Sequence, residues 1–255
     1  IYLIYYKSRM RRNILVKENL YYNLLKLLWI QKMYDDAITF GQRQIKKNYR
    51  SVTGHFPSVK NNRSIGFESS LEKILFLYLE FDNTVETYQE QPRIMIIKNG
   101  KPQKYDVDCF VKRYKKSNLK DALIEVKYLS EFEKNKDIYE KKFNAAKIRS
   151  DEIGVDFKFL TELNFNDIYI SNIDFLYRFI LHPSEDKYDD IILDVLKDKK
   201  ISALELANLI MKSQSEYQRV SNNIWKLVAR NILKTDLENE KVTMKCIVEI
   251  NNGSN

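Results

Sequence analysis

The chain has 255 residues, of which 44% are hydrophobic, so it can fold into one or two domains with a sizeable core. Its formal net charge of +8 favours an anionic partner, and nucleic acid is the first candidate. The two cysteines and two histidines are isolated in the sequence, which argues against a zinc site, a disulfide framework and a serine–histidine triad. A reducing cytoplasm fits this cysteine usage.

The N-terminal part of the chain, residues 1–45, is expected to be a helical extension. Apolar residues within 14–33 recur at helical spacing but are interrupted by charged and amide side chains, which favours an amphipathic helix over a membrane span. The apolar opening is too short to cross a membrane, no cleavage-site pattern follows it, and the first methionine is Met10. These features agree with a truncated or mis-started reading frame, and no membrane partner is expected.

A basic stretch follows over residues 43–64. Gly54 and Pro57 interrupt it, so we expect irregular structure there. Its cations admit two readings, a phosphate-contacting arm or a solvated linker. The candidate DNA contacts are Arg50, Lys60 and Arg63.

Leucines at helical spacing predict a helix over about residues 67–81. Glu72 lies close to the apolar side of this helix, where an uncompensated carboxylate is costly. We therefore expect a partner for Glu72, either a metal ion or an Arg or Lys side chain. Glu68, one helical turn earlier, is a second candidate for the same role.

The middle of the chain predicts a small mixed sheet flanked by helices, in the order αβββαβ. Asn99-Gly100 is expected to be a hairpin turn, and Ile138 is expected to face the core. The expected elements are strands over 84–98 (interrupted at 90–92), 105–111 and 122–127, a helix over 135–150 capped by Gly154, and a strand over 155–161.

Asp108, Glu125 and Lys127 form a D-x(n)-E-x-K pattern, which is typical of metal-dependent nucleases. Side chains alternate along a strand, so Glu125 and Lys127 project from one face, and Asp108 in the preceding strand can converge on them. Carboxylate oxygens are the ligands that Mg²⁺ prefers, and a nearby lysine can hold or activate a water. The alternative is an amphipathic strand with one solvated face.

The last part of the chain predicts helices followed by a hairpin, an arrangement that resembles a winged helix. Such domains bind DNA or dock on other proteins, and the acidic turn at 238–240 favours docking. The expected elements are helices over 168–182, 186–198 and 215–231, a helix from Ala203 with a capping box of Ser202 and Glu205, and strands over 233–236 and 242–247.

An ordered run of motifs resembles the TnsA endonucleases, a subunit of heteromeric transposases. The segment that begins Phe67-Glu-Ser-Ser-Leu-Glu72 is similar to their catalytic helix, and Tyr88-Gln-Glu-Gln-Pro92 contains the Glu-Gln-Pro that follows it. Tyr105-Asp-Val-Asp108 resembles the family's Tyr-x-Pro-Asp, and Ile124-Glu-Val-Lys127 resembles its (Glu/Gln)-Val-Lys. The similarity covers about residues 46–182.

The resemblance implies a restriction-endonuclease-like domain of the PD-(D/E)xK class followed by a C-terminal winged helix. The expected domains are an extension over 1–45, the TnsA-like endonuclease over 46–167, the winged helix over 168–250 and a tail over 251–255.

Carried over residue by residue, Glu72, Asp108 and Glu125 match the metal-ligating positions of the family, and Lys127 matches its active-site lysine. Glu68 does not match a catalytic position. Val107 replaces the proline that usually precedes the aspartate; proline only pre-sets the backbone there, so activity is expected to survive.

The resemblance also implies a function: Mg²⁺-dependent cutting of double-stranded transposon-end DNA at the 5′ ends, with two Mg²⁺ ions for which Mn²⁺ can substitute. A DDE transposase, TnsB, would cut the 3′ ends, and an AAA+ regulator, TnsC, would contact this subunit. The protein would act in a prokaryotic cytoplasm, on the nucleoid. The alternatives are a stand-alone restriction-like or resolvase nuclease and a non-catalytic DNA-binding adaptor.

Overall fold

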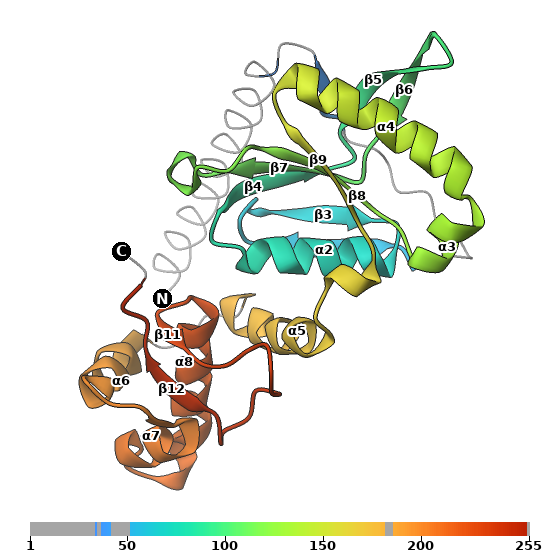
Figure 1. Ribbon diagram of the computed structural model, residues 1–255. Helices are drawn as coiled ribbons and strands as arrows, with labels where there is room; N and C mark the ends of the chain where they lie inside the picture. The colour runs from blue at the N-terminus through green and yellow to red at the C-terminus, as the bar shows by residue number, and fades with distance from the viewer. Residues whose placement is uncertain (1–33, 35–36, 42–51, 182–185, 254–255) are drawn as a thin grey trace, which may run out of the picture. The chain divides into compact units, whose positions relative to one another are not determined.

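The computed structural model describes residue 34 and residues 37–41, 52–181 and 186–253 (Figure 1). Arg50 and most of the predicted N-terminal extension lie outside these residues. The chain divides into two compact units, the first formed by residues 1–76 and 82–162 and the second by residues 77–81 and 163–255.

A four-stranded sheet in the order β4-β7-β8-β9 forms the centre of the first unit. Strand β7 is antiparallel to β4 and β8, and β8 is parallel to β9. Every residue of β7 and β8 is buried, as expected for central strands covered on both faces. The strands are β4 (Val85–Glu90), β7 (Cys109–Arg113), β8 (Ala122–Val126) and β9 (Asp156–Leu160).

Helices α2 (Ser70–Phe81) and α4 (Lys136–Ile153) lie on opposite sides of this sheet (Figure 1). Phe76 of α2 stacks on Tyr88 of β4 with ring centroids 5.6 Å apart. Together with the four strands the two helices give the order α2, β4, β7, β8, α4, β9, so the predicted αβββαβ order of a mixed α/β fold is present. The short helix α3 (Leu129–Lys134) precedes α4 and was not predicted.

The prediction that Ile138 faces the core is wrong, because its side chain is 60% exposed. Phe143 and Ala146 supply the buried side of α4. Gly154 ends the helix in the left-handed region with φ of 85°, as predicted. The first turn of α4, which contains Ile138, is therefore exposed, and the buried side of the helix begins at Phe143.

A hairpin of β5 (Arg93–Lys98) and β6 (Lys101–Asp106) is inserted between β4 and β7. Asn99 and Gly100 form its turn with φ of 53° and 73°, as their sequence predicted. Strand β1 (Ile38–Thr39) pairs with β5, although these two residues fall within the predicted helical extension. Ile38 is fully buried, so burial of this side chain beside β5 outweighs the helical pattern there.

The irregular structure predicted around Gly54 and Pro57 is also wrong. Strands β2 (Gly54–Ser58) and β3 (Arg63–Phe67) form an antiparallel hairpin. Alternate residues of these strands are buried, which stabilises the hairpin. Pro57 is tolerated because β2 lies at the edge of a two-stranded sheet.

Asp82 connects the end of α2 to the central sheet. Its carboxylate accepts hydrogen bonds from Thr84 and pairs with Arg113 of β7 at 3.1 Å. Burial raises the pKa of Asp82, but the hydrogen bonds from Thr84 and Arg113 outweigh it, and the net pKa is lowered.

We expect Asp82→Asn to reduce the free energy of unfolding by about 1.5–3 kcal/mol at pH 7, because hydrogen bonds to a charged group are lost. A lowered pKa stabilises the fold above the ordinary carboxyl pKa of 3.8, and the stabilisation disappears as the pH falls through the folded-state pKa. The difference between variant and wild type should therefore shrink below pH 4 in urea denaturation series. A difference that stays constant down to pH 2.5 would contradict this account.

The second unit consists of helices and a small sheet in the order β10-β12-β11. The Ser202 hydroxyl accepts a hydrogen bond from the Glu205 N–H at 3.1 Å, so the predicted cap is present. Its elements are α5 (Asp167–Leu181), α6 (Asp189–Leu196), β10 (Ile201–Ser202), α7 (Ala203–Ile210), α8 (Tyr217–Ala229), β11 (Leu233–Lys234) and β12 (Ile247–Ile250). Among the described residues of both units, the short 3₁₀ turns are η1 (Lys115–Ser117), η2 (Glu162–Asn164), η3 (Asp186–Tyr188) and η4 (Gln214–Glu216).

The predicted second strand of the C-terminal hairpin, residues 242–247, is misplaced. Val242 donates its N–H to the side chain of Asn172 at 2.9 Å, and the Cys246 N–H closes a turn on the Thr243 carbonyl at 3.0 Å. These bonds replace strand pairing, so β12 begins only at Ile247 and pairs with β11 through Glu249 and Ile250. Among the helices that the structure describes, none combines the length and apolar character needed to cross a membrane.

Candidate active site

Asp108 lies in the connection between β6 and β7, not within a strand as predicted. Its carboxylate accepts a hydrogen bond from the Val126 N–H, at the end of β8, at 2.8 Å. Its carbonyl accepts from the Gln91 N–H at 3.0 Å. The break between the two strands therefore turns the Asp108 carboxylate toward the end of β8.

Glu125 and Lys127 meet Asp108 at this end of β8. The Lys127 Nζ lies 3.3 Å from Asp108 Oδ2 and 3.2 Å from Glu125 Oε1. Glu125 is 2% exposed, and its Oε2 has no hydrogen-bond partner among the described residues. The structure thus brings three of the four predicted catalytic residues together, with one ammonium group between two carboxylates.

The pKa values in this cluster are shifted by burial and by mutual charge. Burial, and then the neighbouring Asp108, raise the pKa of Glu125 to about 7. Burial also raises the pKa of Asp108, although Lys127 opposes the shift. Burial lowers the pKa of Lys127, but Asp108 and Glu125 outweigh it and raise the pKa above its usual range. Lys127 is therefore a cation at neutral pH, beside two carboxylates that repel one another.

Glu72, the fourth predicted residue, is held at the N-terminus of α2. Its carboxylate accepts hydrogen bonds from the Ser69 hydroxyl at 2.9 Å and the Glu68 N–H at 3.0 Å, and the Glu72 N–H donates to Ser69 Oγ at 3.1 Å. The bond from the Glu72 N–H to Ser69 Oγ is the N-cap half of a capping box, and the Glu72 carboxylate completes the cap through the Glu68 N–H and the Ser69 hydroxyl. We expected the buried Glu72 carboxylate to have a metal ion or an Arg or Lys side chain as its partner. In the structure its hydrogen-bond partners are groups at the start of α2 instead. Burial, and then Asp108, raise the pKa of Glu72 to about 7, so Glu72 also lies in the electrostatic field of the cluster.

We expect Ser69→Ala to lower the free energy of unfolding by about 1 kcal/mol, because the N-terminus of α2 loses its side-chain cap. Ser70→Ala is the matched control, because this neighbouring serine makes no side-chain hydrogen bond among the described residues. Urea denaturation of both variants measures the difference. Equal stability of the two variants would contradict a capping role for Ser69.

A divalent cation fits this site by the chemistry of its donors. Asp108 and Glu125 offer carboxylate oxygens, and the buried, unpartnered Oε2 of Glu125 lacks the partner that burial demands. Among the described residues no three acidic, histidine or cysteine side chains lie close enough together to hold a metal ion. Mg²⁺ does not need such a cage, because it is commonly bound by one or two carboxylates together with water and substrate phosphates.

Two residues beside the cluster were missed by the sequence analysis. The Tyr105 side chain is buried beside Glu125, and burial, then the charge of Glu125 and a hydrogen bond to it, raise the pKa of Tyr105. The Lys142 Nζ of α4 lies 3.8 Å from the centroid of the Tyr105 ring. Tyr105 belongs to the motif that contains Asp108, whereas Lys142 carries no signal because it reaches the site from a distant helix.

The described members of the predicted DNA-contacting stretch are engaged within the protein. Lys60 donates to the backbone carbonyls of Asp82 and Val85. Arg63 forms a two-point ion pair with Glu90, in which Nη1 and Oε1 are 2.7 Å apart. Neither side chain is thus an uncommitted cation for phosphate, and their predicted role in DNA binding has no support from the geometry.

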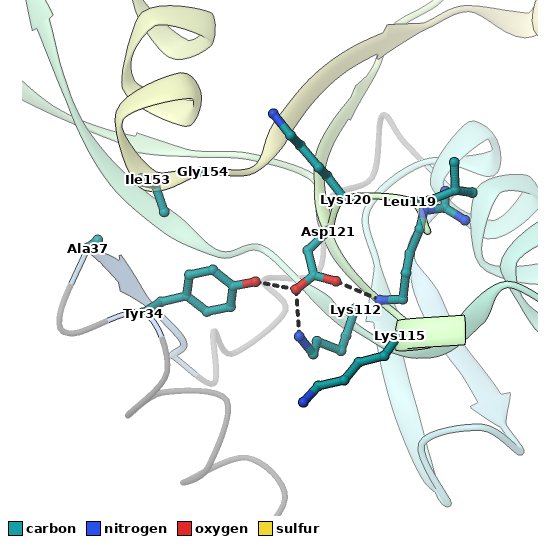
Figure 2. Close-up of a pocket in the computed structure, with 10 residues that line it drawn as sticks. Tyr34, Ala37, Lys112, Lys115, Leu119, Lys120, Asp121, Ile153 and Gly154 are labelled. Atoms are coloured by element: carbon teal, nitrogen blue, oxygen red, sulfur yellow. Dashed lines mark hydrogen bonds and ion pairs between the residues drawn. The ribbon is translucent and has the colours of Figure 1, made fainter. Parts of the chain in front are cut away.

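A cavity of about 490 Å³ lies at the opposite end of β8, where Asp121 precedes the strand (Figure 2). Asp121 accepts hydrogen bonds from the Tyr34 hydroxyl, the Lys112 Nζ at 2.7 Å and the Arg113 N–H at 2.7 Å. The length of β8 separates this network from Glu125. The cavity is therefore distinct from the acidic cluster, and Asp121 ties β7 to β8 there.

Residues 82–162 match the family model described as TnsA-like endonuclease N terminal. This segment of the chain is a TnsA-like endonuclease domain. It contains Asp108, Glu125 and Lys127, together with the β5–β6 hairpin, whereas Glu72 lies before it. No curated protein matches the chain. The match supports the TnsA-like resemblance expected from the motifs, and with it the endonuclease class of this segment.

Proposed function

We propose that the chain is a Mg²⁺-dependent endonuclease subunit of a heteromeric transposase, which hydrolyses the phosphodiester at the 5′ ends of a transposon during cut-and-paste transposition. One observation carries the proposal: Asp108, Glu125 and Lys127 converge inside the TnsA-like segment. The family supplies the nuclease class, and the two carboxylates beside a permanent cation supply the chemistry that phosphodiester hydrolysis needs.

In this proposal Asp108 and Glu125 hold Mg²⁺ through their carboxylate oxygens, and Glu72 joins them by exchanging its bonds at the start of α2. When bound, the cation offsets charge on the scissile phosphate and lowers the pKa of a bound water. Lys127 stays protonated because its pKa is raised, so it orients the attacking water or a phosphate oxygen rather than acting as the base. The predicted cofactor remains a pair of Mg²⁺ ions, for which Mn²⁺ can substitute.

The proposed partners are a DDE transposase that cuts the 3′ ends and an AAA+ regulator. The order of α6, β10, α7, α8, β11 and β12, with β12 between the other two strands, supports a winged-helix assignment for the second unit. The turn at 236–240, between β11 and β12, carries Asp236, Glu238 and Glu240, whose charges repel phosphate, although Lys241 and Lys245 follow in the same loop. We therefore propose that this unit docks on a protein partner, the AAA+ regulator, rather than on DNA.

Strand mapping on labelled transposon-end duplex tests the function. The chain is incubated with Mg²⁺ alone and together with the DDE transposase encoded beside it. The proposal predicts a cut at the 5′ end of the element only when the transposase is present. Cutting by the chain alone, without end specificity, would identify a stand-alone restriction-like or resolvase nuclease. Intact DNA binding without cutting in any mixture would identify a non-catalytic adaptor.

A further inference from the structure

The β5–β6 hairpin carries three lysines that have no ion pair or side-chain hydrogen bond within the part of the chain that the structure describes: Lys98, Lys101 and Lys104. Lys98 ends β5, and the other two lie on β6, which is an edge strand of its sheet. A net charge of +8 favours an anionic partner, and Lys60 and Arg63 are already engaged. The hairpin is therefore a place where uncommitted positive charge gathers within the TnsA-like segment.

The base of the hairpin is fastened to the catalytic aspartate. The Gln91 N–H donates to the Asp108 carbonyl at 3.0 Å, and the Val107 N–H donates to the Pro92 carbonyl at 2.9 Å. Arg93, the first residue of β5, and Asp106, the last residue of β6, form a two-point ion pair at 2.6 and 2.9 Å. The hairpin therefore has a fixed starting point beside a residue that is proposed to hold the metal ion at the scissile phosphate.

Positive charge continues from the hairpin to the acidic cluster through Lys142. Its ammonium group packs over the Tyr105 ring of β6. Burial lowers the pKa of Lys142, attraction to Glu125 and Asp108 opposes this shift, and repulsion from Lys127 and Lys98 adds to it, so Lys142 lies in the field of both the hairpin and the cluster.

The outward face of the hairpin also has the apolar character of a groove-contacting surface. Met95 is 43% exposed and Ile97 is 63% exposed. In the strand register Met95 lies opposite Lys104, and Ile97 lies opposite Pro102, so all four share one face, whereas Lys98 and Lys101 lie opposite one another beside the turn, at positions of the other face. Proteins that enter a DNA groove combine cations for the phosphates with apolar side chains such as Ile, Met and Pro against the sugars and base steps.

We infer that the β5–β6 hairpin lies in a groove of the DNA that flanks the scissile phosphate, with Lys98, Lys101 and Lys104 on backbone phosphates and Met95 and Ile97 against the groove. The inference rests on the proposed function, because it takes DNA as the substrate. From base to tip the hairpin spans about 20 Å, at roughly 3.4 Å per residue. Its lysines therefore contact phosphates within about six base pairs of the cut, at 3.4 Å per base pair.

Lysines on an edge strand have another use, because they discourage pairing with other chains. That use accounts for Lys101 and Lys104 on β6. It does not account for Lys98, which ends the inner strand β5 near Lys142, or for the apolar side chains on the same hairpin. The two explanations differ in what they predict for DNA affinity.

The test compares two triple variants of the full chain, both in an Asp108→Asn background and without metal, so that no cleavage occurs. Lys98→Gln/Lys101→Gln/Lys104→Gln removes the hairpin cations. Lys115→Gln/Lys116→Gln/Lys120→Gln is the matched control, because it removes the same charge from the exposed connection at the other end of β8. Fluorescence anisotropy with labelled duplex over a salt series measures the affinity.

We expect the hairpin triple to bind duplex at least about tenfold more weakly at low salt, and its slope of log K against log[salt] to fall by roughly 2 to 3, at about 0.9 per lost phosphate contact. The control triple should keep the wild-type slope. A hairpin triple with wild-type affinity and slope overturns the inference and leaves the edge-strand explanation. Two other results also overturn the inference: a larger loss of affinity in the control triple, and no duplex binding at low salt by the Asp108→Asn chain that keeps all its lysines.

Failure of this inference is distinguishable from failure of the proposed function. Binding is measured without cleavage, and strand cutting is measured separately with the wild-type chain and its partner transposase. A chain that cuts the 5′ strand while the hairpin triple binds normally retains the function and loses the inference. A chain that never cuts, yet binds DNA through the hairpin lysines, loses the function and retains the inference as a property of an adaptor.

Discussion

Asp108→Asn is expected to abolish strand cleavage while the fold and DNA binding survive. The amide retains an oxygen that can accept the Val126 N–H, so the connection between β6 and β7 keeps its anchor on β8. The change removes the negative charge that a divalent cation requires at the centre of the cluster. Such charge stabilisation is worth several kcal/mol in the transition state, so we expect a loss of about 10³-fold or more in single-turnover rate.

The control for this variant is Asp151→Asn, which removes a carboxylate from an exposed position near the end of α4, away from the cluster. It should cleave at the wild-type rate. Circular dichroism and thermal unfolding of both variants verify that the fold is retained. Cleavage by Asp108→Asn within about threefold of wild type, in the complete transposase, would contradict the assignment of the active site.

Lys127→Gln is expected to lower the cleavage rate by about 10²–10³-fold, the usual cost of removing one preorganised group from a developing negative charge. Lys127 lies 3.2–3.3 Å from the carboxylates of Glu125 and Asp108 and is held protonated by them. Its loss leaves two acidic groups without the cation between them. Their pKa values should then rise further, so protonation would compete more strongly with metal binding.

Two measurements separate a cationic role for Lys127 from a basic one. Lys127→Arg retains a charge that cannot be deprotonated, so it should recover part of the activity that the glutamine variant loses. Lys147→Gln, at an exposed position on α4, is the control and should match wild type. An inactive Lys127→Arg, together with a wild-type rate that keeps rising tenfold per pH unit beyond pH 9, would indicate that a neutral lysine is the base.

Much of the central sheet could be read from local patterns. The break at residues 90–92, the Asn99-Gly100 turn and the Gly154 cap were all placed correctly, because each depends on the backbone preferences of a few adjacent residues. The convergence of Glu125 and Lys127 follows in the same way from the alternation of side chains along β8. Local rules therefore located the end of the sheet at which the candidate site lies.

The errors concern features that depend on distant parts of the chain. Asp108 was assigned to a continuous strand, but β6 belongs to one sheet and β7 to another, so the chain must change partners between them. Ile138 has the hydrophobicity of a core residue, yet its side chain is 60% exposed, because it lies on the side of α4 away from Phe143 and Ala146. The hairpin of β2 and β3 is specified by the packing of Phe56 with Phe76 of α2, which the basic composition of that stretch conceals.

Glu72 illustrates a signal that was available but was interpreted differently. Ser69 and Glu72 have the spacing of a capping box, and this local rule accounts for the buried carboxylate without a metal ion. The family resemblance assigns the same carboxylate to metal binding. Both roles use the same oxygens, so Glu72 must exchange its helix-capping bonds if it is to join Asp108 and Glu125 on a cation.

The most direct test is the dependence of single-turnover cleavage on Mg²⁺ concentration, for wild type and for Glu125→Gln, on labelled transposon-end duplex in the presence of the partner transposase. The variant keeps the shape of the side chain but replaces the carboxylate of Glu125, whose buried Oε2 lies near Asp108, by a neutral amide. The account predicts a saturable rise of the wild-type rate with Mg²⁺, no cleavage in EDTA, and a rate for the variant that stays low or saturates only at much higher Mg²⁺. Cleavage in EDTA at the full rate, or identical Mg²⁺ curves for the two proteins, would contradict a metal-dependent site at Asp108, Glu125 and Lys127.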